Sequence, residues 1–218
     1  MAESVEIRPC RSDDFDAVAE ICYRTGYGGR DVASSGVFSD RVLFGLLFCR
    51  YYLLYEADLS FVAVNAAGRV VGYVLGCADT ERYSRRFALL MIPRILIRIG
   101  ARTLWRDPPT VRELLRWARG VPWKAANPAG PAFPAHLHMG LLPEAQRQGI
   151  GSRLLIHMEA RLRDRGVGGI HLVTSNYHRQ AIPFYLKHGY TQLLNRGHRM
   201  WSGLRDYHSI VFVKRLAP

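Results

Sequence analysis

One short loop, residues 146–151, constrains this chain more than any other segment, because it follows an apolar run and precedes an amphipathic one. The pattern predicts a strand that enters a helix through a glycine turn. Glycine lets the backbone approach a ligand closely, and the first N–H groups of a helix have no partner within it. Together with the helix dipole, these groups favour an anion such as a pyrophosphate. The alternative interpretation is a plain glycine turn.

Two familiar phosphate motifs are excluded at this loop. The dinucleotide fingerprint requires a third glycine, but Leu154 stands at that position, and no Gly-Lys-Ser/Thr follows as a nucleoside triphosphate loop requires. If the loop binds phosphate, it therefore does so through neither the dinucleotide motif nor the nucleoside triphosphate motif.

Composition predicts an ordinary globular protein. The chain has 218 residues, of which 49% are hydrophobic, enough for one large core. Its beginning lacks the pattern of a secretory signal, and no apolar run is long enough to span a bilayer, so we expect a cytoplasmic protein. Its four cysteines have no zinc-type spacing and are interpreted as reduced, mostly buried thiols: Cys10, Cys22, Cys49 and Cys77.

Hydrophobic periodicity predicts one mixed sheet with helices on both faces. The expected helices are residues 15–22 (capped by residues 12–14), 39–55, 87–106, 110–119, 151–165 and 180–188. The expected strands are residues 5–8, 59–64, 70–75, 136–142, 169–174, 190–194, 198–202 and 209–213, of which 59–64 and 70–75 form a hairpin.

Residues 81–134 differ in composition and are interpreted as a basic helical insertion. Arginines spaced four apart form one stripe on the helix expected over 87–106: Arg94, Arg98, Arg102 and Arg106. Residues 82–119 can contact a membrane surface or an acidic partner. The interpretation we favour is that they form helices packed on the domain, with their arginines in solvent.

The net charge of the whole chain is +12, which indicates either an anionic partner or a biased genome composition. Because no recognised nucleic-acid motif is present, we expect no nucleic-acid partner.

Three features occur together in the second half of the chain. They are the loop Gln-Arg-Gln-Gly-Ile-Gly at 146–151, the preceding Leu-Leu-Pro-Glu at 141–144, and Ala-Ile-Pro-Phe-Tyr-Leu-Lys-His-Gly-Tyr at 181–190. In this combination residues 136–190 resemble the GNAT superfamily of acetyl-CoA-dependent N-acetyltransferases. The strand at 136–143 is similar to that of bacterial and O-GlcNAcase-associated members.

The resemblance implies an α/β (α+β) fold, with a mixed, mostly antiparallel sheet of about seven strands flanked by helices. The basic helical insertion then lies before the central strand. We therefore expect residues 1–218 to form a single domain, with an amino-terminal half (5–80), the insertion (81–134) and a cofactor-binding core with the last strands (135–218).

The same resemblance implies acetyl-CoA as co-substrate and no metal. The residues expected to bind it are Leu141, Leu142, Gln146, Arg147, Gln148, Gly149, Ile150, Gly151, Ser152, Asn176, Ala181, Phe184 and Tyr185. A splay between strands near 139–142 would turn the Leu141 N–H towards the thioester oxygen as an oxyanion-type donor.

Proton transfer would fall to side chains around that point. Tyr185 matches the family tyrosine that protonates the departing thiolate. His138 is the candidate base, because a histidine that titrates near neutrality can accept the proton of the ammonium group. His136 shares its strand face, and either histidine can equally be a satisfied core residue; Asp79, Glu81 and Glu144 are further candidates.

Two positions depart from the family pattern. Gly140 replaces an aspartate, and His178 stands where the family often has an asparagine, with Asn176 two residues earlier.

The expected function is transfer of an acetyl or other short acyl group from acetyl-CoA to a primary amine of a small molecule or peptide. The alternative is a catalytically degenerate acyl-CoA-binding or sensor domain whose basic insertion binds a partner or membrane surface. Monomer and homodimer both stay open.

Overall fold

The computed structural model describes residues 5–120, 127–197 and 200–216. Within these ranges seven strands form one sheet in the order β1-β2-β3-β4-β5-β7-β6. All neighbouring strands are antiparallel except β4 and β5, which are parallel. This confirms the expected mixed, mostly antiparallel sheet. The strands are β1 (Glu6–Pro9), β2 (Ser60–Val64), β3 (Val70–Cys77), β4 (Ala135–Leu141), β5 (Gly169–Ser175), β6 (Thr191–Gly197) and β7 (His208–Arg215).

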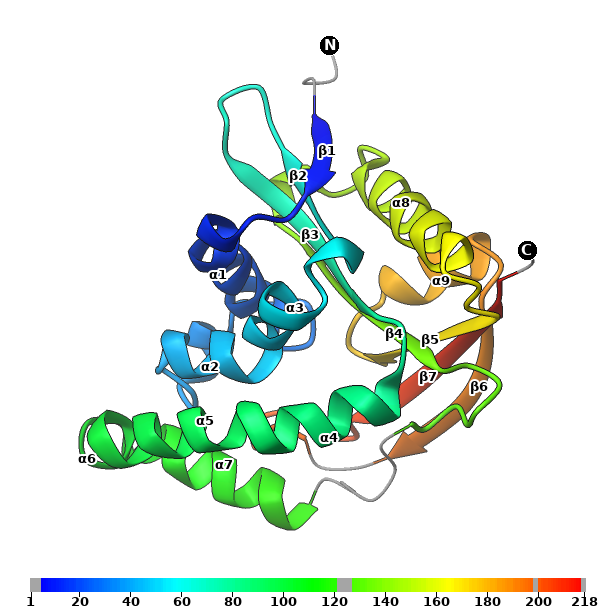
Figure 1. The fold of residues 1–218 in the computed structure, drawn as a ribbon. Helices are drawn as coiled ribbons and strands as arrows, with labels where there is room; N and C mark the ends of the chain where they lie inside the picture. Colours follow the sequence, from blue (N-terminus) through cyan, green and yellow to red (C-terminus); the bar gives the residue numbers. More distant parts are fainter. Residues whose placement is uncertain (1–4, 121–126, 198–199, 217–218) are drawn as a thin grey trace.

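Helices cover both faces of the sheet, with α1, α2 and α3 on one side and α8 and α9 on the other (Figure 1). The helices α4 to α7 lie along one end of the molecule. None of the described helices is both long and apolar enough to cross a membrane. The helices are α1 (Phe15–Thr25), α2 (Arg41–Phe48), α3 (Arg50–Tyr55), α4 (Thr80–Leu90), α5 (Ile92–Arg98), α6 (Leu104–Arg106), α7 (Pro108–Gly120), α8 (Ile150–Asp164) and α9 (Ala181–Lys187).

Helix α8 shows how local pattern builds the core beneath the predicted loop. Leu154, Met158 and Leu162 recur every four residues and are completely buried, so they form the apolar stripe of an amphipathic helix. The stripe packs on β2 and β3. The loop before α8 is thereby held at a set place beside the sheet.

The hairpin predicted around residues 65–69 is confirmed. Its strands β2 and β3 pair in antiparallel register, and the Asn65 N–H donates to the Arg69 carbonyl at 2.9 Å. Gly68 turns the chain with a φ of 75°, a region that favours glycine.

The helix expected over 39–55 is divided at Cys49, whose backbone (φ −124°, ψ −43°) leaves the helical region. This break separates α2 from α3. Gly45 also brings α2 close to α1, because an added Cβ there would lie 2.8 Å from the Cβ of Ala19. The pattern of apolar residues alone did not reveal this tertiary contact.

The helix expected over 87–106 begins earlier and is divided. Asp79 caps α4 by accepting a hydrogen bond from the Arg82 N–H at 2.9 Å. The helix ends before Pro93, which has no N–H to continue it, and a π-helical turn (Ile99–Thr103) separates α5 from α6.

The strand expected over 198–202 is not found in its described part. Residues 198 and 199 lie outside the described residues, and residues 200–202 form bends and a turn.

Candidate functional site

The predicted phosphate loop has the backbone of an anion-binding turn. Arg147 and Gly149 both adopt left-handed conformations, with φ of 60° and 77°. The first hydrogen bond of α8 runs from the Arg153 N–H to the Gly149 carbonyl at 3.1 Å. The N–H groups of the helix positions before Arg153 therefore have no partner in the helix and point out of its positive end. Such a turn is suited to a phosphate or pyrophosphate.

Both glutamines of the loop fold back on the chain. The Gln146 side chain donates to the carbonyl of Leu141 at 3.1 Å, and the Gln148 side chain donates to the carbonyl of Glu144 at 2.7 Å. These bonds tie the loop to the end of β4 and to the turn that follows it. The side chains thus shape the loop, while its backbone N–H groups remain available to a ligand.

The space beside Gly149 is open, because an added Cβ there would meet no atom within 4 Å. Gly151 lies where β4, α8 and α9 converge, because an added Cβ would contact Phe184 at 3.5 Å and Leu141 at 3.6 Å. The tertiary structure thus brings together three residues that the sequence analysis assigned to one site.

Strands β4 and β5 separate after a short contact. They pair only through Ala135 and His136, whereas β4 pairs with β3 from His136 to Leu141. The Leu142 N–H donates to Val71 at 2.9 Å, so alternate N–H groups of β4, including that of Leu141, point away from β3. The Leu141 N–H therefore faces the opening between β4 and β5, as expected for an oxyanion-type donor.

Tyr185 lies on α9 and is 6% exposed. Its ring contacts Tyr190 and Phe212, and burial raises the pKa of its hydroxyl, which is therefore protonated at neutral pH. A protonated hydroxyl can donate a proton or a hydrogen bond.

His188 was not predicted from the sequence to lie beside the loop. Its Nε2 lies 2.9 Å from the hydroxyl of Ser152, a bond that links the first turn of α8 to α9. Its ring also packs against Phe184. The signal available in the sequence was its place inside the segment at 181–190.

The two histidines of β4 have different surroundings. His136 uses both ring nitrogens, with the hydroxyls of Tyr52 and Thr80 each at 2.8 Å. Burial lowers its pKa to about 3, so it is a satisfied, neutral structural histidine.

His138 is the less constrained histidine. It stacks on Phe48 and lies 3.3 Å from the hydroxyl of Tyr73. Burial lowers its pKa to about 4, with a smaller contribution from His178. The imidazole is neutral at pH 7, so it offers a lone pair but has a weak affinity for a proton.

The other candidate bases lie elsewhere. Asp79 is used as the cap of α4, and Glu81 and Glu144 are exposed on α4 and on the turn after β4.

Tyr73 explains why glycine replaces aspartate at position 140. A Cβ on Gly140 would lie 3.0 Å from three atoms of the Tyr73 ring and hydroxyl. The tyrosine of β3 therefore occupies the space that a side chain on β4 would need.

The amide of Asn176 is used within the fold. It donates to the carbonyl of Asp206 and accepts from the His208 N–H, both at 2.9 Å. His178 stands at the asparagine position of the family and is half-buried, and burial lowers its pKa. Asn176 thus organises the segment before β7.

The insertion is packed on the domain, but not all of its arginines are solvated. Arg98 forms a bidentate pair with Asp40, with Nη2 to Oδ1 at 2.6 Å and Nε to Oδ2 at 3.1 Å. Thr103 donates to the same carboxylate at 2.6 Å. The pair joins the insertion to the first turn of α2.

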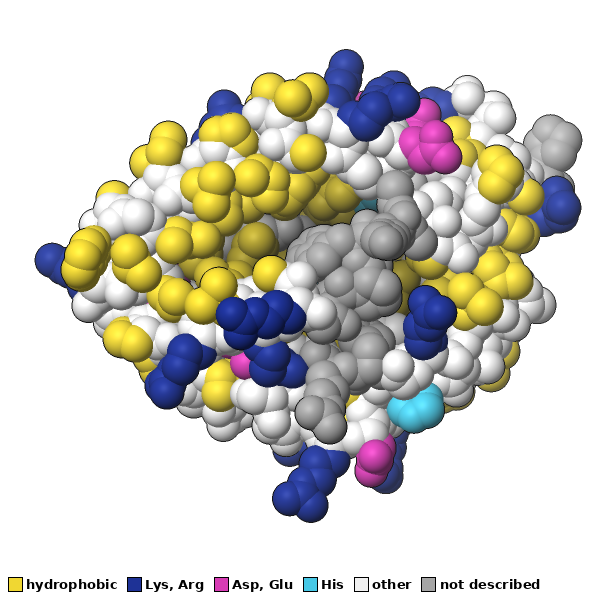
Figure 2. Space-filling model, turned by 90° about the horizontal axis from the view of Figure 1, so that it is seen from below, with side chains coloured by type: hydrophobic (Ala, Val, Ile, Leu, Met, Phe, Trp, Pro, Cys, Tyr) yellow, Lys and Arg dark blue, Asp and Glu magenta, His cyan; other side chains and the backbone are white. Residues whose placement is uncertain are grey.

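One face of the insertion is strongly apolar. Figure 2 shows hydrophobic side chains gathered around a hollow on the side of α4 to α7, with Lys and Arg side chains at its margin. Leu89, Ile97 and Trp105 are 75%, 71% and 76% exposed.

Comparison with known proteins gives the family. The sequence model of the acetyltransferase (GNAT) domain matches residues 118–192. A structure called SsHAT is 31% identical, with 99% of this chain and 100% of that chain covered and a TM-score of 0.74. The narrower resemblance to O-GlcNAcase-associated members stays a prediction.

More distant structures share the fold. A GNAT phosphinothricin acetyltransferase from Sinorhizobium meliloti, solved with acetyl-CoA, is 15% identical (100% and 90% covered, TM-score 0.58). The ribosomal-protein-S18-alanine N-acetyltransferase of Escherichia coli is 14% identical (99% and 96% covered, TM-score 0.56). The glycine loop, the separation of β4 from β5 and these likenesses agree: the chain belongs to the GNAT superfamily of acetyltransferases.

Proposed function

We propose that this protein transfers an acetyl or other short acyl group from acetyl-CoA to a primary amine of a small molecule or peptide. The observation that carries the proposal is the presence of two sets of N–H groups at the two ends of the segment 141–152. Those of the first turn of α8 suit a pyrophosphate, and that of Leu141 faces the opening between β4 and β5. A phosphorylated thioester that reaches both sets would have its anionic end and its reacting end bound.

In this proposal the residues from Gln146 to Ser152 bind the pyrophosphate through their backbone. Leu142, Ala181 and Phe184 would contact the rest of the cofactor. The Leu141 N–H stabilises the negative charge that develops on the thioester oxygen, a type of contact whose loss costs about 3–4 kcal/mol in the barrier.

Proton transfer completes the reaction. Tyr185 donates a proton to the departing thiolate, for which burial keeps its hydroxyl protonated. His138 is the candidate acceptor for the proton of the amine. Its pKa of about 4 means that its neutral form is fully present from pH 6 to 8, so His138 adds no step to the rate profile in that range.

The test is mass-spectrometric detection of acetylated products from a broad panel of amines and peptides. A Gly151→Asp variant would place a carboxylate among the free N–H groups of α8 and is expected to weaken acetyl-CoA binding more than about 10-fold. Gly168→Asp is the matched control, because an added Cβ there meets no atom within 4 Å. If Gly151→Asp acetylates the panel normally, the loop assignment is wrong.

The role of Tyr185 has its own test. Tyr185→Phe removes only the hydroxyl, so kcat is expected to fall by about 10²–10⁴-fold, the usual contribution of a general acid, with little change in acetyl-CoA affinity. Stopped-flow or steady-state thiol release measures this. Turnover at the wild-type rate at every pH would remove the acid role.

The alternative proposal is an acyl-CoA-binding sensor that has lost catalysis. The use of the Asn176 amide within the fold and the histidine at position 178 favour it. Its basic insertion would then contact a partner or an anionic membrane surface. Tight acetyl-CoA binding with no acetylated product from any acceptor would support the sensor over the enzyme.

A further inference from the structure

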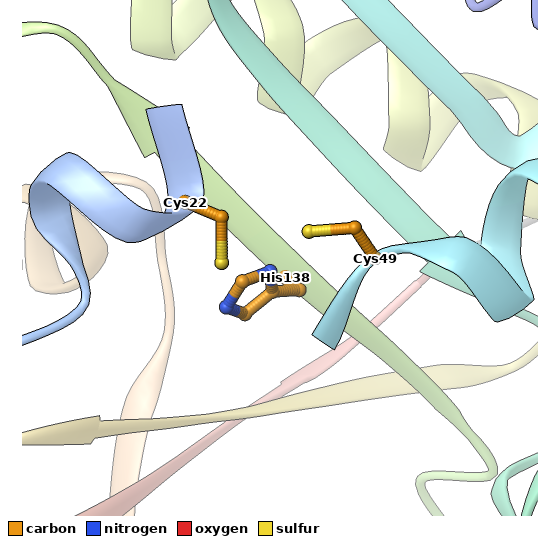
Figure 3. Close-up of side chains that lie close together, drawn as sticks. All are labelled: Cys22, Cys49 and His138. Atoms are coloured by element: carbon orange, nitrogen blue, oxygen red, sulfur yellow. The ribbon is translucent and has the colours of Figure 1, made fainter. Parts of the chain in front are cut away.

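Two cysteines and a histidine from distant parts of the sequence face one point in the interior. Cys22 lies on α1, Cys49 between α2 and α3, and His138 on β4 (Figure 3). One ligand atom from each lies within 4.8 Å of the other two. Because 27 and 89 residues separate them in the chain, their spacing gave no sign of a shared site.

This arrangement matches the donor set of a zinc-type ion. Zinc binds cysteine sulfur at about 2.3 Å and histidine nitrogen at about 2.0–2.1 Å, which places tetrahedral ligand atoms roughly 3.5–3.8 Å apart. The ligand atoms, which lie within 4.8 Å of one another, would therefore have to approach by at most about 1.3 Å. Two thiolates with one imidazole favour zinc over magnesium or calcium, which prefer oxygen. We propose that Cys22, Cys49 and His138 bind a thiophilic divalent ion of the zinc class.

The charges of the site balance in the bound state. Cys22 and Cys49 are 3% and 1% exposed, so two isolated thiolates would be costly there. A divalent ion with two thiolates has no net charge. Binding follows the balance M²⁺ + 2 Cys–SH → M(S–Cys)₂ + 2 H⁺, in which no group is oxidised or reduced and the imidazole contributes a lone pair without losing a proton.

The protonation states of the free protein fit this balance. Burial, with Cys22 beside it, raises the pKa of Cys49 well above its ordinary value, so Cys49 is a neutral thiol without an ion. Burial lowers the pKa of His138 to about 4, so its ring is already the neutral form that binds metals.

Three protein ligands leave the fourth tetrahedral position open. The hydroxyl of Tyr73 lies beside the cluster, 3.3 Å from Nδ1 of His138, and can orient that ring or occupy the open position. His138 is half-buried and is the most exposed member of the cluster, so the ion would reach the site from its side.

The ion would join α1, the junction of α2 and α3, and β4. Acetyl transfer in the GNAT superfamily needs no metal, so this ion is a further ligand that stabilises these elements. An ion bound to His138 occupies the lone pair that the proposed base uses, so in the ion-loaded protein water or another group would accept the amine proton. Ion binding itself does not require acetyl transfer.

The test is titration of reduced, chelator-treated full-length protein with Co²⁺ and then Zn²⁺. We expect one Co²⁺ per chain with tetrahedral d–d bands and a sulfur-to-cobalt charge-transfer band, displacement by Zn²⁺, and release of two protons per ion. At 100 times the Kd the unfolding temperature is expected to rise by about 5–10 °C. Weak Co²⁺ binding without the sulfur band would overturn the proposal.

Variants identify the ligands. Cys22→Ser, Cys49→Ser and His138→Gln are each expected to weaken binding at least 10-fold, and each serine variant to release one proton fewer. Cys77→Ser is the matched control, because Cys77 is buried and free but lies outside the cluster. Equal loss in Cys77→Ser and Cys49→Ser would overturn the assignment. If a variant does not fold, the sulfur-to-cobalt charge-transfer band and the number of protons released by the wild-type protein still test the proposal.

Discussion

At the scale of single residues, the contact between Gly140 and Tyr73 illustrates how a neighbour restricts a position. The strand that carries His138 and Leu141 has room for a side chain at 140 only if the ring on β3 moves. A departure from the family pattern thus has a packing cause. The resemblance showed which residue was unusual, whereas the register of β3 and β4 shows why.

Gly140→Asp is expected to lower the free energy of unfolding by about 1–3 kcal/mol, because its Cβ would lie 3.0 Å from the Tyr73 ring. Urea unfolding measures the loss, with the open position in Gly168→Asp as control. Replacing Tyr73 by leucine in the same chain should recover part of the loss. Strictly additive effects of Gly140→Asp and Tyr73→Leu would contradict this explanation.

At the scale of elements, the insertion is held by a charged contact that also caps a helix. Asp40 accepts from the Leu43 N–H of α2 at 3.0 Å and forms the bidentate pair with Arg98 of α5. Spacing alone placed Arg98 on a basic stripe and favoured its exposure. Its partner lies 58 residues away, so no local pattern could identify the pair.

Arg98→Met is expected to cost about 2–3 kcal/mol of stability, because it leaves the largely buried Asp40 carboxylate without its cation. Arg161→Met is the control, since its pair with Asp164 is 3.9 Å long and exposed on both sides, and it should cost less than about 1 kcal/mol. Chemical unfolding at low and moderate salt compares the two. Equal effects would mean that the contact does not hold the insertion.

At the scale of the whole molecule, the interior contains several histidines that folding keeps neutral. Burial lowers the pKa of His136 to about 3 and that of His138 to about 4. Their ordinary value in an unfolded chain is about 6.5, so the unfolded state binds more protons between these limits. The stability that they contribute is therefore complete above pH 6.5 and is lost as the pH falls towards 4 and 3.

Between pH 6.5 and 5 the free energy of unfolding is expected to fall by about 1 kcal/mol per pH unit for each of these histidines, with the slope approaching about 1.4 kcal/mol per pH unit at the acid end. Urea unfolding of the chelator-treated protein across this range measures the slope. His136→Gln, which keeps a hydrogen-bonding side chain, should reduce the slope by about one proton. A pH-independent stability, or an unchanged slope in the variant, would show that the buried histidines are not responsible.

The sequence by itself determined the features whose signals are local. Glycines in the loop before α8, the apolar stripe of α8, the hairpin at residues 65–69 and the motif at 181–190 all depend on neighbouring residues, so each could be predicted. Their order was enough to identify the superfamily.

Only the tertiary structure decided features that depend on contacts between distant segments. The separation of β4 from β5, the division of the helix expected over 39–55, the use of the Asn176 amide and the Asp40–Arg98 pair all arise in this way. So does the meeting of Cys22, Cys49 and His138. The physical reason is that the packing of elements sets the hydrogen-bond register, the space available to each side chain and its burial. The periodicity of one segment does not identify the segments that pack against it.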